Sequence, residues 1–258
     1  MIDVVSLTQH YGIRPVLKDI DLHINPGELA AVMGPNGMGK TTLLAAIAGI
    51  LSPQKGYVEI NGRRRRRTME EEAAIRKDVA YLPADAWLPM MAVRDFIVTV
   101  GRVYEVEDER LLDHTDRLLH LFDLEGVQDA PIGSCSTGQQ KKAALCSALV
   151  TDAPVMILDE PFSGGLDPSG ILALKRVLQR LAQRRDVTVL IATPVPEIVE
   201  EIAHRIVILV DGRIAAFDTP DGLRKQTGCI GSLQEVLEHI VNPDTAANIE
   251  RYFEGEER

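Results

Sequence analysis

Short apolar runs broken by turn residues make up the start of the chain. Three of them, each predicted to form a strand, lie at residues 2–7, 16–24 and 29–33. Turn residues separate the runs, among them Asn25-Pro26-Gly27. A glycine-rich turn follows the third run, and residues 39–50 are good helix formers that end before Ser52-Pro53. The pattern therefore predicts a strand, a loop and a helix in succession.

The rest of the chain changes from helical periodicity to almost wholly apolar runs. Residues 57–60, followed by Asn61-Gly62, predict a hairpin element, and leucines recur with helical spacing between 110 and 122. Apolar runs then lie at residues 155–158, 187–192 and 206–210, with helical segments such as 171–184 between them. Such runs are typical of parallel strands whose two faces are covered by helices. The predicted class is α/β, with antiparallel strands near the start and a helical insert in the middle.

One motif lies between a predicted strand and a predicted helix. It is Gly34-Pro35-Asn36-Gly37-Met38-Gly39-Lys40-Thr41, which fits G-x-x-x-x-G-K-[ST]. Glycines let successive backbone N–H groups turn towards phosphate oxygens, and the following helix adds the positive end of its dipole. Lys40 is expected to reach the β- and γ-phosphates, and the Thr41 hydroxyl to bind Mg²⁺. Thr42 is assigned to the same site, and a glycine-rich turn without a ligand is the competing interpretation.

Two adjacent carboxylates follow the apolar run at 155–158. Asp159 and Glu160 therefore lie at the carboxyl end of a predicted strand, where ligands bind in open α/β sheets. Because a nucleotide phosphate site needs Mg²⁺, Asp159 is the expected metal ligand. Glu160 is expected to polarise the attacking water. Surface charge without a chemical role is the alternative interpretation of this pair.

Composition narrows the classes of partner. The 258 residues include 28 Lys and Arg against 38 Asp and Glu, a net charge of −10, which argues against nucleic acid as the main partner. No apolar run approaches the roughly 20 residues that span a bilayer, and the opening residues lack the pattern of a secretion signal. Neither a membrane-spanning nor a secreted chain is expected. The three cysteines have no metal-ligand spacing and are expected to be reduced thiols.

Together these motifs resemble the ATP-binding subunit of an ABC transporter, over roughly residues 1–222. Tyr11 lies where the family places an aromatic ring against adenine, and Cys135-Ser136-Thr137-Gly138-Gln139 lies where the family has Leu-Ser-Gly-Gly-Gln. Ser163-Gly164-Gly165-Leu166-Asp167 is similar to the family's loop that contacts a partner subunit. The resemblance implies a RecA-like P-loop NTPase core with an N-terminal antiparallel β subdomain. It also implies a helical subdomain at about 88–150 and a C-terminal extension at 223–258.

The resemblance also implies how such a chain works. ATP and Mg²⁺ bind between two subunits that close face to face, so that Ser136, Gly138 and Gln139 of one complete the phosphate site of the other. The second subunit is a copy of this chain or a different ATP-binding subunit. Both would act on an integral membrane transporter subunit from the cytoplasmic face of the inner or plasma membrane, with export favoured over import. For Ser136 to Gln139, an ordinary capped helix start is the alternative.

Three positions depart from the family's pattern. Thr137 stands where the family has glycine, Ala84 where it has a glutamine that senses Mg²⁺, and Pro194 where it has the switch histidine that contacts the γ-phosphate. Alanine cannot coordinate a metal, and proline offers neither a ring nitrogen nor a backbone N–H. We therefore expect nucleotide binding to survive and hydrolysis to be slow, since one lost donor to developing charge costs a factor of roughly 10² to 10³.

Two further segments leave alternatives open. Trp87 is favoured for contact with a membrane subunit, whereas Leu88 and Met90 fit docking and core packing equally. The five residues Arg63–Arg67 are expected to form a solvated hairpin end balanced by nearby acids, with contact to anionic lipid headgroups as the alternative. For the whole protein, the rival functions are a P-loop small-molecule kinase and an ABC-type ATP switch without a role in transport.

Overall fold

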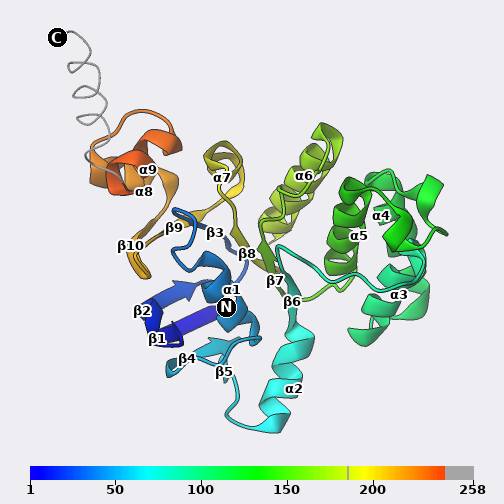
Figure 1. The fold of residues 1–258 in the computed structure, drawn as a ribbon, viewed down its shortest axis with the longest axis horizontal. Coiled ribbons are helices and arrows are strands. Elements are labelled where there is room, and N and C mark those ends of the chain that lie inside the picture. The colour runs from blue at the N-terminus through cyan, green and yellow to red at the C-terminus, as the bar shows by residue number, and fades with distance from the viewer. Residues whose placement is uncertain (185, 242–258) are drawn as a thin grey trace.

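The computed structural model describes residues 1–184 and 186–241, and it contains two β-sheets that face each other across one helix (Figure 1). The smaller sheet is antiparallel and has the strand order β2-β1-β4-β5. Its strands are β1 Ile2–Tyr11, β2 Arg14–Ile24, β4 Lys55–Ile60 and β5 Arg63–Arg64. This sheet confirms the antiparallel region expected near the start of the chain.

The larger sheet has the strand order β10-β9-β3-β8-β7-β6. Five of its strands are parallel, and β10 joins the edge antiparallel to β9. Its strands are β3 Leu29–Met33, β6 Val79–Leu82, β7 Val155–Asp159, β8 Thr188–Ala192, β9 Arg205–Val210 and β10 Arg213–Asp218. The three central strands β3, β8 and β7 are buried along their whole length. This is why their sequences are apolar throughout instead of alternating.

The two faces of the larger sheet pack into different cores. Helix α1 (Lys40–Ala48) lies between the sheets. Ala30 and Val32 of β3 belong to the same apolar cluster as the side chains of α1, whereas Leu29 and Met33 belong to the cluster on the opposite face. Since β3 is held from both sides, the loop that leaves its carboxyl end starts from a fixed point.

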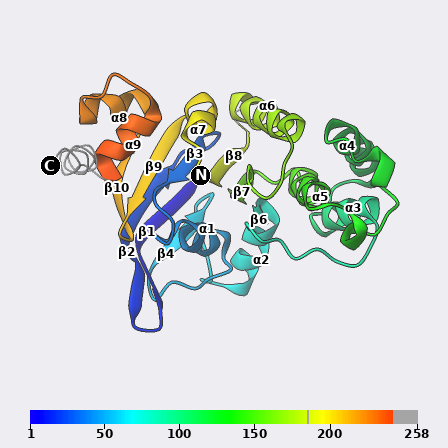
Figure 2. The same cartoon turned by 45° about the horizontal axis from the view of Figure 1, so that its top comes forward.

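Three helices form an arm beside the larger sheet, which we call the helical arm. They are α3 Val93–Val103, α4 Asp108–Leu121 and α5 Thr137–Leu149. Two short 3₁₀ turns, Glu125–Val127 and Ile132–Ser134, connect α4 to α5. The arm lies on the β6 side of the sheet, away from β10 (Figures 1 and 2). The helical region expected in the middle of the chain is present, while the domain boundaries at 88, 150 and 222 stay predictions.

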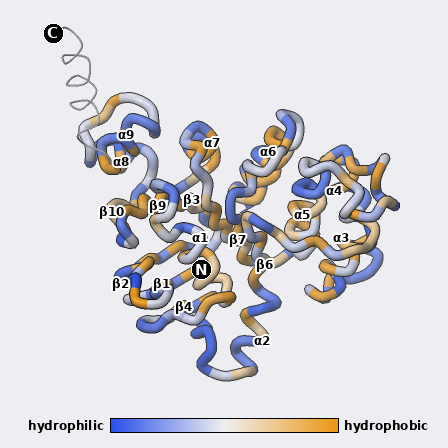
Figure 3. The backbone as a smooth tube through the Cα atoms, viewed as in Figure 1, coloured by the Kyte–Doolittle hydropathy of each residue, from blue (hydrophilic) through white to orange (hydrophobic). Residues whose placement is uncertain are grey.

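The other helices described are α2 Met69–Asp78, α6 Pro168–Arg184, α7 Pro196–Ile202, α8 Pro220–Thr227 and α9 Leu233–Val241. Hydrophobic periodicity does not predict α2, because charged residues dominate it. Its sequence signal is Thr68, whose hydroxyl accepts a hydrogen bond from the backbone N–H of Glu71 at 3.1 Å. Hydrophilic and hydrophobic residues alternate along the outer helices (Figure 3). Within the residues described, every helix is too short or too polar to cross a bilayer.

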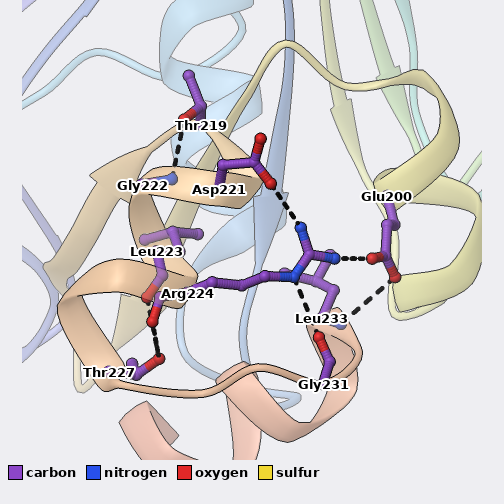
Figure 4. Close-up of polar contacts among 9 residues, drawn as sticks. All are labelled: Glu200, Thr219, Asp221, Gly222, Leu223, Arg224, Thr227, Gly231 and Leu233. Atoms are coloured by element: carbon purple, nitrogen blue, oxygen red, sulfur yellow. Dashed lines mark hydrogen bonds and ion pairs between the residues drawn. The ribbon is translucent and has the colours of Figure 1, made fainter.

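One arginine attaches α8 and α9 to α7 (Figure 4). Arg224 of α8 forms ion pairs with Asp221, at 2.9 Å, and with Glu200 of α7. Its Nε also donates to the carbonyl oxygen of Gly231 at 3.0 Å. The second carboxylate oxygen of Glu200 accepts a hydrogen bond from the backbone N–H of Leu233, where α9 begins, at 3.3 Å. Residues 242–258 of the expected C-terminal extension lie outside the described residues.

Arg65 differs from the solvated hairpin end expected of the arginine run. The other four arginines are exposed, but only 7% of Arg65 is. Its Nε donates to the carbonyl oxygen of Ile47 at 2.7 Å, and its Nη1 pairs with Glu72 at 2.9 Å. That carbonyl belongs to the last turn of α1, where backbone acceptors have no partner within the helix. Arg65 therefore caps the C-terminal end of the helix that follows the glycine-rich loop.

We expect Arg65→Met to lower the free energy of unfolding by about 1 to 3 kcal/mol, because the Ile47 carbonyl loses its donor and the half-buried carboxylate of Glu72 keeps only Arg76 and the backbone N–H of Arg66. Urea denaturation of the ligand-free protein measures the change. The matched control is Arg67→Met, since that side chain is 70% exposed and lies 4.0 Å from Glu71. It should change the free energy by less than about 0.5 kcal/mol. Equal losses in the two variants would contradict the capping role.

Candidate functional site

The phosphate loop, residues 34–41, connects the carboxyl end of β3 to the N-terminus of α1. The N-cap of α1 is Gly39, which provides no side chain to accept a hydrogen bond, and the first turn contains no acidic residue. The first backbone N–H groups of a helix have no partner within it. Together with the helix dipole, they form a site for an anion.

Gly34 sets the path of this loop. Its φ is +142°, and a Cβ at this position would lie 2.1 Å from the carbonyl oxygen of Leu209 on β9. No residue with a side chain fits so close to the neighbouring strand. The next residues continue around the turn, with Asn36 and Gly37 exposed and Pro35 and Met38 half-buried. The Sδ of Met38 accepts a hydrogen bond from the backbone N–H of Asp211 at 3.3 Å.

Lys40 points back into the loop. Its ammonium donates to the carbonyl oxygens of Gly34, at 2.8 Å, and Pro35, at 3.0 Å. Burial lowers the pKa of Lys40, while the nearby carboxylates of Glu160 and Asp159 act in the opposite direction. Asp159 ends β7 and Glu160 follows it, so the fold brings residues of the two sequence motifs close together. The neighbouring Thr41 is exposed to solvent, and Thr42 is buried.

Asp159 is a buried carboxylate without a partner. It ends β7, it is 1% exposed, and neither of its carboxylate oxygens has a hydrogen bond of normal geometry within the described residues. Burial raises the pKa of Asp159; the Thr41 hydroxyl lowers it, Glu160 raises it, and Lys141 and Lys40 lower it. An orphaned carboxylate facing a threonine hydroxyl is a donor set that suits Mg²⁺. The residues present therefore fit the metal that the sequence predicts here.

Glu160 begins the loop after β7 in an unusual conformation. Its φ is +46°, and its backbone N–H donates to the carbonyl oxygen of Ala192 on β8 at 2.8 Å. Its carboxylate accepts a hydrogen bond from the hydroxyl of Ser163 at 3.2 Å. These contacts hold Glu160 at the start of the loop that follows β7.

Ser136, Gly138 and Gln139 lie on the helical arm. The Ser136 hydroxyl accepts from the backbone N–H of Gln139 at 3.3 Å, and the Gln139 side chain accepts from the backbone N–H of Ser136 at 2.9 Å. This capping box opens α5, as the alternative interpretation expects. A Cβ on Gly138 would lie 2.5 Å from the carbonyl oxygen of Gly165. Within the described part of the chain, no hydrogen bond joins these three residues to the phosphate loop.

Sequence patterning does not identify two lysines of α5. Lys142 is 5% exposed and pairs with Asp167 at 3.0 Å. This hydrogen bond is the main reason that the pKa of Asp167 is lowered, and the backbone N–H of Gly170 adds to it. The Lys141 ammonium donates to the carbonyl oxygen of Ala84 at 3.5 Å. One sequence feature could have indicated them. They lie five and six residues after Ser136, on the inner side of a helix whose start the sequence predicts.

Ala84 and Pro194, two of the positions that depart from the family pattern, follow strands of the same sheet. Ala84 is half-buried and follows β6, and Pro194 is exposed and follows β8. The residue before Pro194, Thr193, is fully buried, and its hydroxyl accepts from the backbone N–H of Val195 at 3.3 Å. Tyr11 is separate from this edge: it ends β1 beside the turn into β2 and is 55% exposed.

A protein-family model matches more than half of the chain. The model described as ABC transporter matches residues 17–163, which contain the phosphate loop, residues 135–139, Asp159 and Glu160. Tyr11 and Pro194 lie outside the matched residues.

The similar proteins include some that are named as importers and some that are named as exporters. The sulfate/thiosulfate import ATP-binding protein of Nocardia farcinica is 31% identical over 94% of this chain and 74% of its own length. The Nod factor export ATP-binding protein I of Paraburkholderia xenovorans is 31% identical over 95% of this chain and 78% of its own.

Solved structures share the fold. A structure titled as the ATP-binding subunit of an ABC transporter superposes with a TM-score of 0.86 at 28% identity, covering 93% of this chain and 99% of its own. A dimeric ATP-binding cassette bound to ADP and Pi has a TM-score of 0.76 at 23% identity, covering 85% and 98%. The second likeness concerns the fold alone.

We expect Asp159→Asn to raise the free energy of unfolding of the ligand-free protein by about 1 kcal/mol, because it removes an unpaired buried charge. The same change should abolish the additional stabilisation that Mg²⁺ with nucleotide gives, since a carboxylate ligand is lost. Thermal unfolding with and without Mg²⁺ nucleotide measures both effects. Asp129→Asn, at an exposed position, is the control and should change neither. A ligand-free variant that is less stable than the natural chain would contradict the assignment.

Proposed function

The chain belongs to the ABC transporter family of ATP-binding proteins, and on this premise we propose that it binds MgATP at a dimer interface and drives a separate membrane subunit. The family membership makes it an ATP-binding ATPase subunit and removes the small-molecule kinase as a rival. The observation that carries the proposal is the meeting of Lys40, Asp159 and Glu160 at the start of α1.

The site residues have separable roles in this proposal. The N–H groups of the phosphate loop and Lys40 bind the phosphates, and exposed Tyr11 stacks on adenine. Thr41 and Asp159 would hold Mg²⁺, which neutralises phosphate charge when bound. Glu160 accepts a proton from the water that attacks the γ-phosphorus, and the bond to the bridging oxygen breaks to give ADP and inorganic phosphate.

A second ATP-binding subunit completes the site. Ser136 and Thr137 at the N-terminus of α5 are exposed, which leaves them accessible to the phosphates of a facing subunit. A hydroxyl beside a helix N-terminus favours an anion. The capping box does not compete with this role, because the hydroxyl retains its own O–H as a donor. A homodimer and a heterodimer with a catalytically stronger subunit both fit the proposal.

Hydrolysis is proposed to be slow. Ala84 and Pro194 provide no side-chain donor or metal ligand at the two strand ends that flank Asp159. Each lost group that would contact developing charge costs a factor of roughly 10² to 10³ in rate. A non-transport ATP switch is the second candidate, and it rests on the same two positions, since they favour binding over turnover.

The surface after β6 is proposed to dock on the membrane subunit. Trp87 is 83% exposed and Met90 is 99% exposed, whereas Leu88 is half-buried and packs against the core. Exposed large apolar side chains this close together mark an interaction site. The chain would thus lie peripherally on the cytoplasmic face of a membrane. Export stays a prediction, because the similar proteins include both importers and exporters by name.

We expect the purified chain to hydrolyse ATP at below about 1 s⁻¹, and Lys40→Ala to abolish both binding and turnover. The double change of Ala84→Gln with Pro194→His should raise kcat by at least about 10², because it restores two polar groups at the site. Phosphate release measures turnover, and calorimetry measures binding. Turnover of tens per second by the natural chain would contradict the proposal of slow hydrolysis, while the proposal of ATP binding would stand.

We expect Trp87→Ala to weaken association with the membrane subunit about tenfold or more, as removal of a central aromatic contact does. Recovery of an integral membrane protein from solubilised native membranes with tagged chain measures it. The control is Ile13→Ala, which removes an apolar side chain that is 96% exposed at the β1–β2 turn. Recovery of no membrane protein by any form of the chain would favour the non-transport switch.

A further inference from the structure

Lys141 reaches the place where position 84 lacks a functional side chain. It lies in the first half of α5 on the helical arm, and its ammonium is 3.5 Å from the carbonyl oxygen of Ala84. Its methylene carbons pass beside Gly164, where a Cβ would lie 3.7 Å from Cδ and 3.9 Å from Cε. The side chain therefore extends between the loop after β6 and the loop after β7, and it is half-buried there.

Three carboxylates lie near enough to this ammonium to favour its charged form. They are Asp159 and Glu160 at the end of β7 and Asp85 beside Ala84, and each favours the charged form of the lysine against the effect of burial. Among the described residues, Lys141 forms no ion pair, whereas the adjacent Lys142 is paired with Asp167 and Lys40 is bound to loop carbonyls. Lys141 is thus a charged donor beside the nucleotide site with only one long hydrogen bond.

We propose that Lys141 is a further phosphate-binding residue, whose ammonium contacts the terminal phosphate of ATP bound in its own subunit. The inference rests on the proposed function and goes beyond it, because it assigns a role to a residue of the arm within the same chain. A lysine cannot replace a neutral metal ligand, since an ammonium carries three donors and no acceptor. It can supply a charge-assisted hydrogen bond to a phosphate oxygen, which leaves Mg²⁺ to Asp159 and Thr41.

This contact would also report which nucleotide is bound. Lys141 belongs to the helical arm, while the phosphate loop and Asp159 belong to the core. A phosphate held by both would join the arm to the core, and ADP, which lacks the γ-phosphate, would not. The link therefore gives ATP and ADP different effects on the position of α5 without a glutamine at position 84.

The test compares the affinities of two nucleotides in one variant. We expect Lys141→Met to weaken binding of Mg²⁺ with a non-hydrolysable ATP analogue about tenfold, as loss of one charge-assisted hydrogen bond does, and to leave the affinity for MgADP unchanged. Calorimetry at fixed ionic strength measures both constants. Lys141→Arg should retain most of the preference for the triphosphate. Lys77→Met is the charge-matched control, because Lys77 pairs with exposed Glu105, and it should change neither affinity.

Several results would overturn the inference. Equal weakening for the two nucleotides would make Lys141 a structural support of the arm, and tighter binding of the analogue by Lys141→Met would show that the ammonium opposes Mg²⁺ instead of binding phosphate. An unchanged affinity for both would show that the side chain does not reach the nucleotide. If the natural chain binds neither nucleotide, the proposed function fails and this inference with it; if it binds both and Lys141→Met keeps the same preference, only this inference fails.

Discussion

The structure depends on an electrostatic arrangement that the protein alone does not complete. The N-terminus of α1 has no capping side chain, and none of the residues described forms a hydrogen bond of normal geometry with the buried carboxylate of Asp159. Packing fixes both groups, because β3 and β7 are buried on their two faces and cannot shift to relieve either one. A ligand that brings phosphate to the helix and a cation to the carboxylate satisfies both together. Stability and nucleotide binding are therefore linked in this fold.

The sequence predicts those parts of the fold that depend on local pattern. The phosphate loop, the buried strands and the pair Asp159-Glu160 are contiguous, and their residue types have few other uses at that spacing. Arg65, Lys141 and Lys142 escape prediction because their roles depend on partners far along the chain, at Ile47, Ala84 and Asp167. A run of five arginines indicates a solvated surface, and only the fold shows that its third member is inside.

Ala84 and Pro194 depart from the family pattern at positions to which we assign turnover and not binding. The residues proposed to hold phosphates and metal lie together, whereas the two altered positions, Ala84 and Pro194, follow the strands on either side of β7. With the slow hydrolysis proposed above, such a site would hold its nucleotide longer than rapid cycling requires, and the bound state itself would act as the signal. Lys141 of α5 then becomes important, because its ammonium extends from the helical arm to position 84, where alanine provides no functional side chain.

The attachment of α8 and α9 to α7 makes the C-terminal helices part of the core. Val199 and Ile202 of α7 share one apolar cluster with Leu223 and Val236, and Arg224 binds Glu200 across the same junction. Because α7 begins two residues after Pro194, a protease cut or a premature stop codon near residue 219 would unpack the helix that supports one strand end of the nucleotide site. Loss of these C-terminal helices would in this way disturb the edge of the sheet at which the phosphate loop and Asp159 lie.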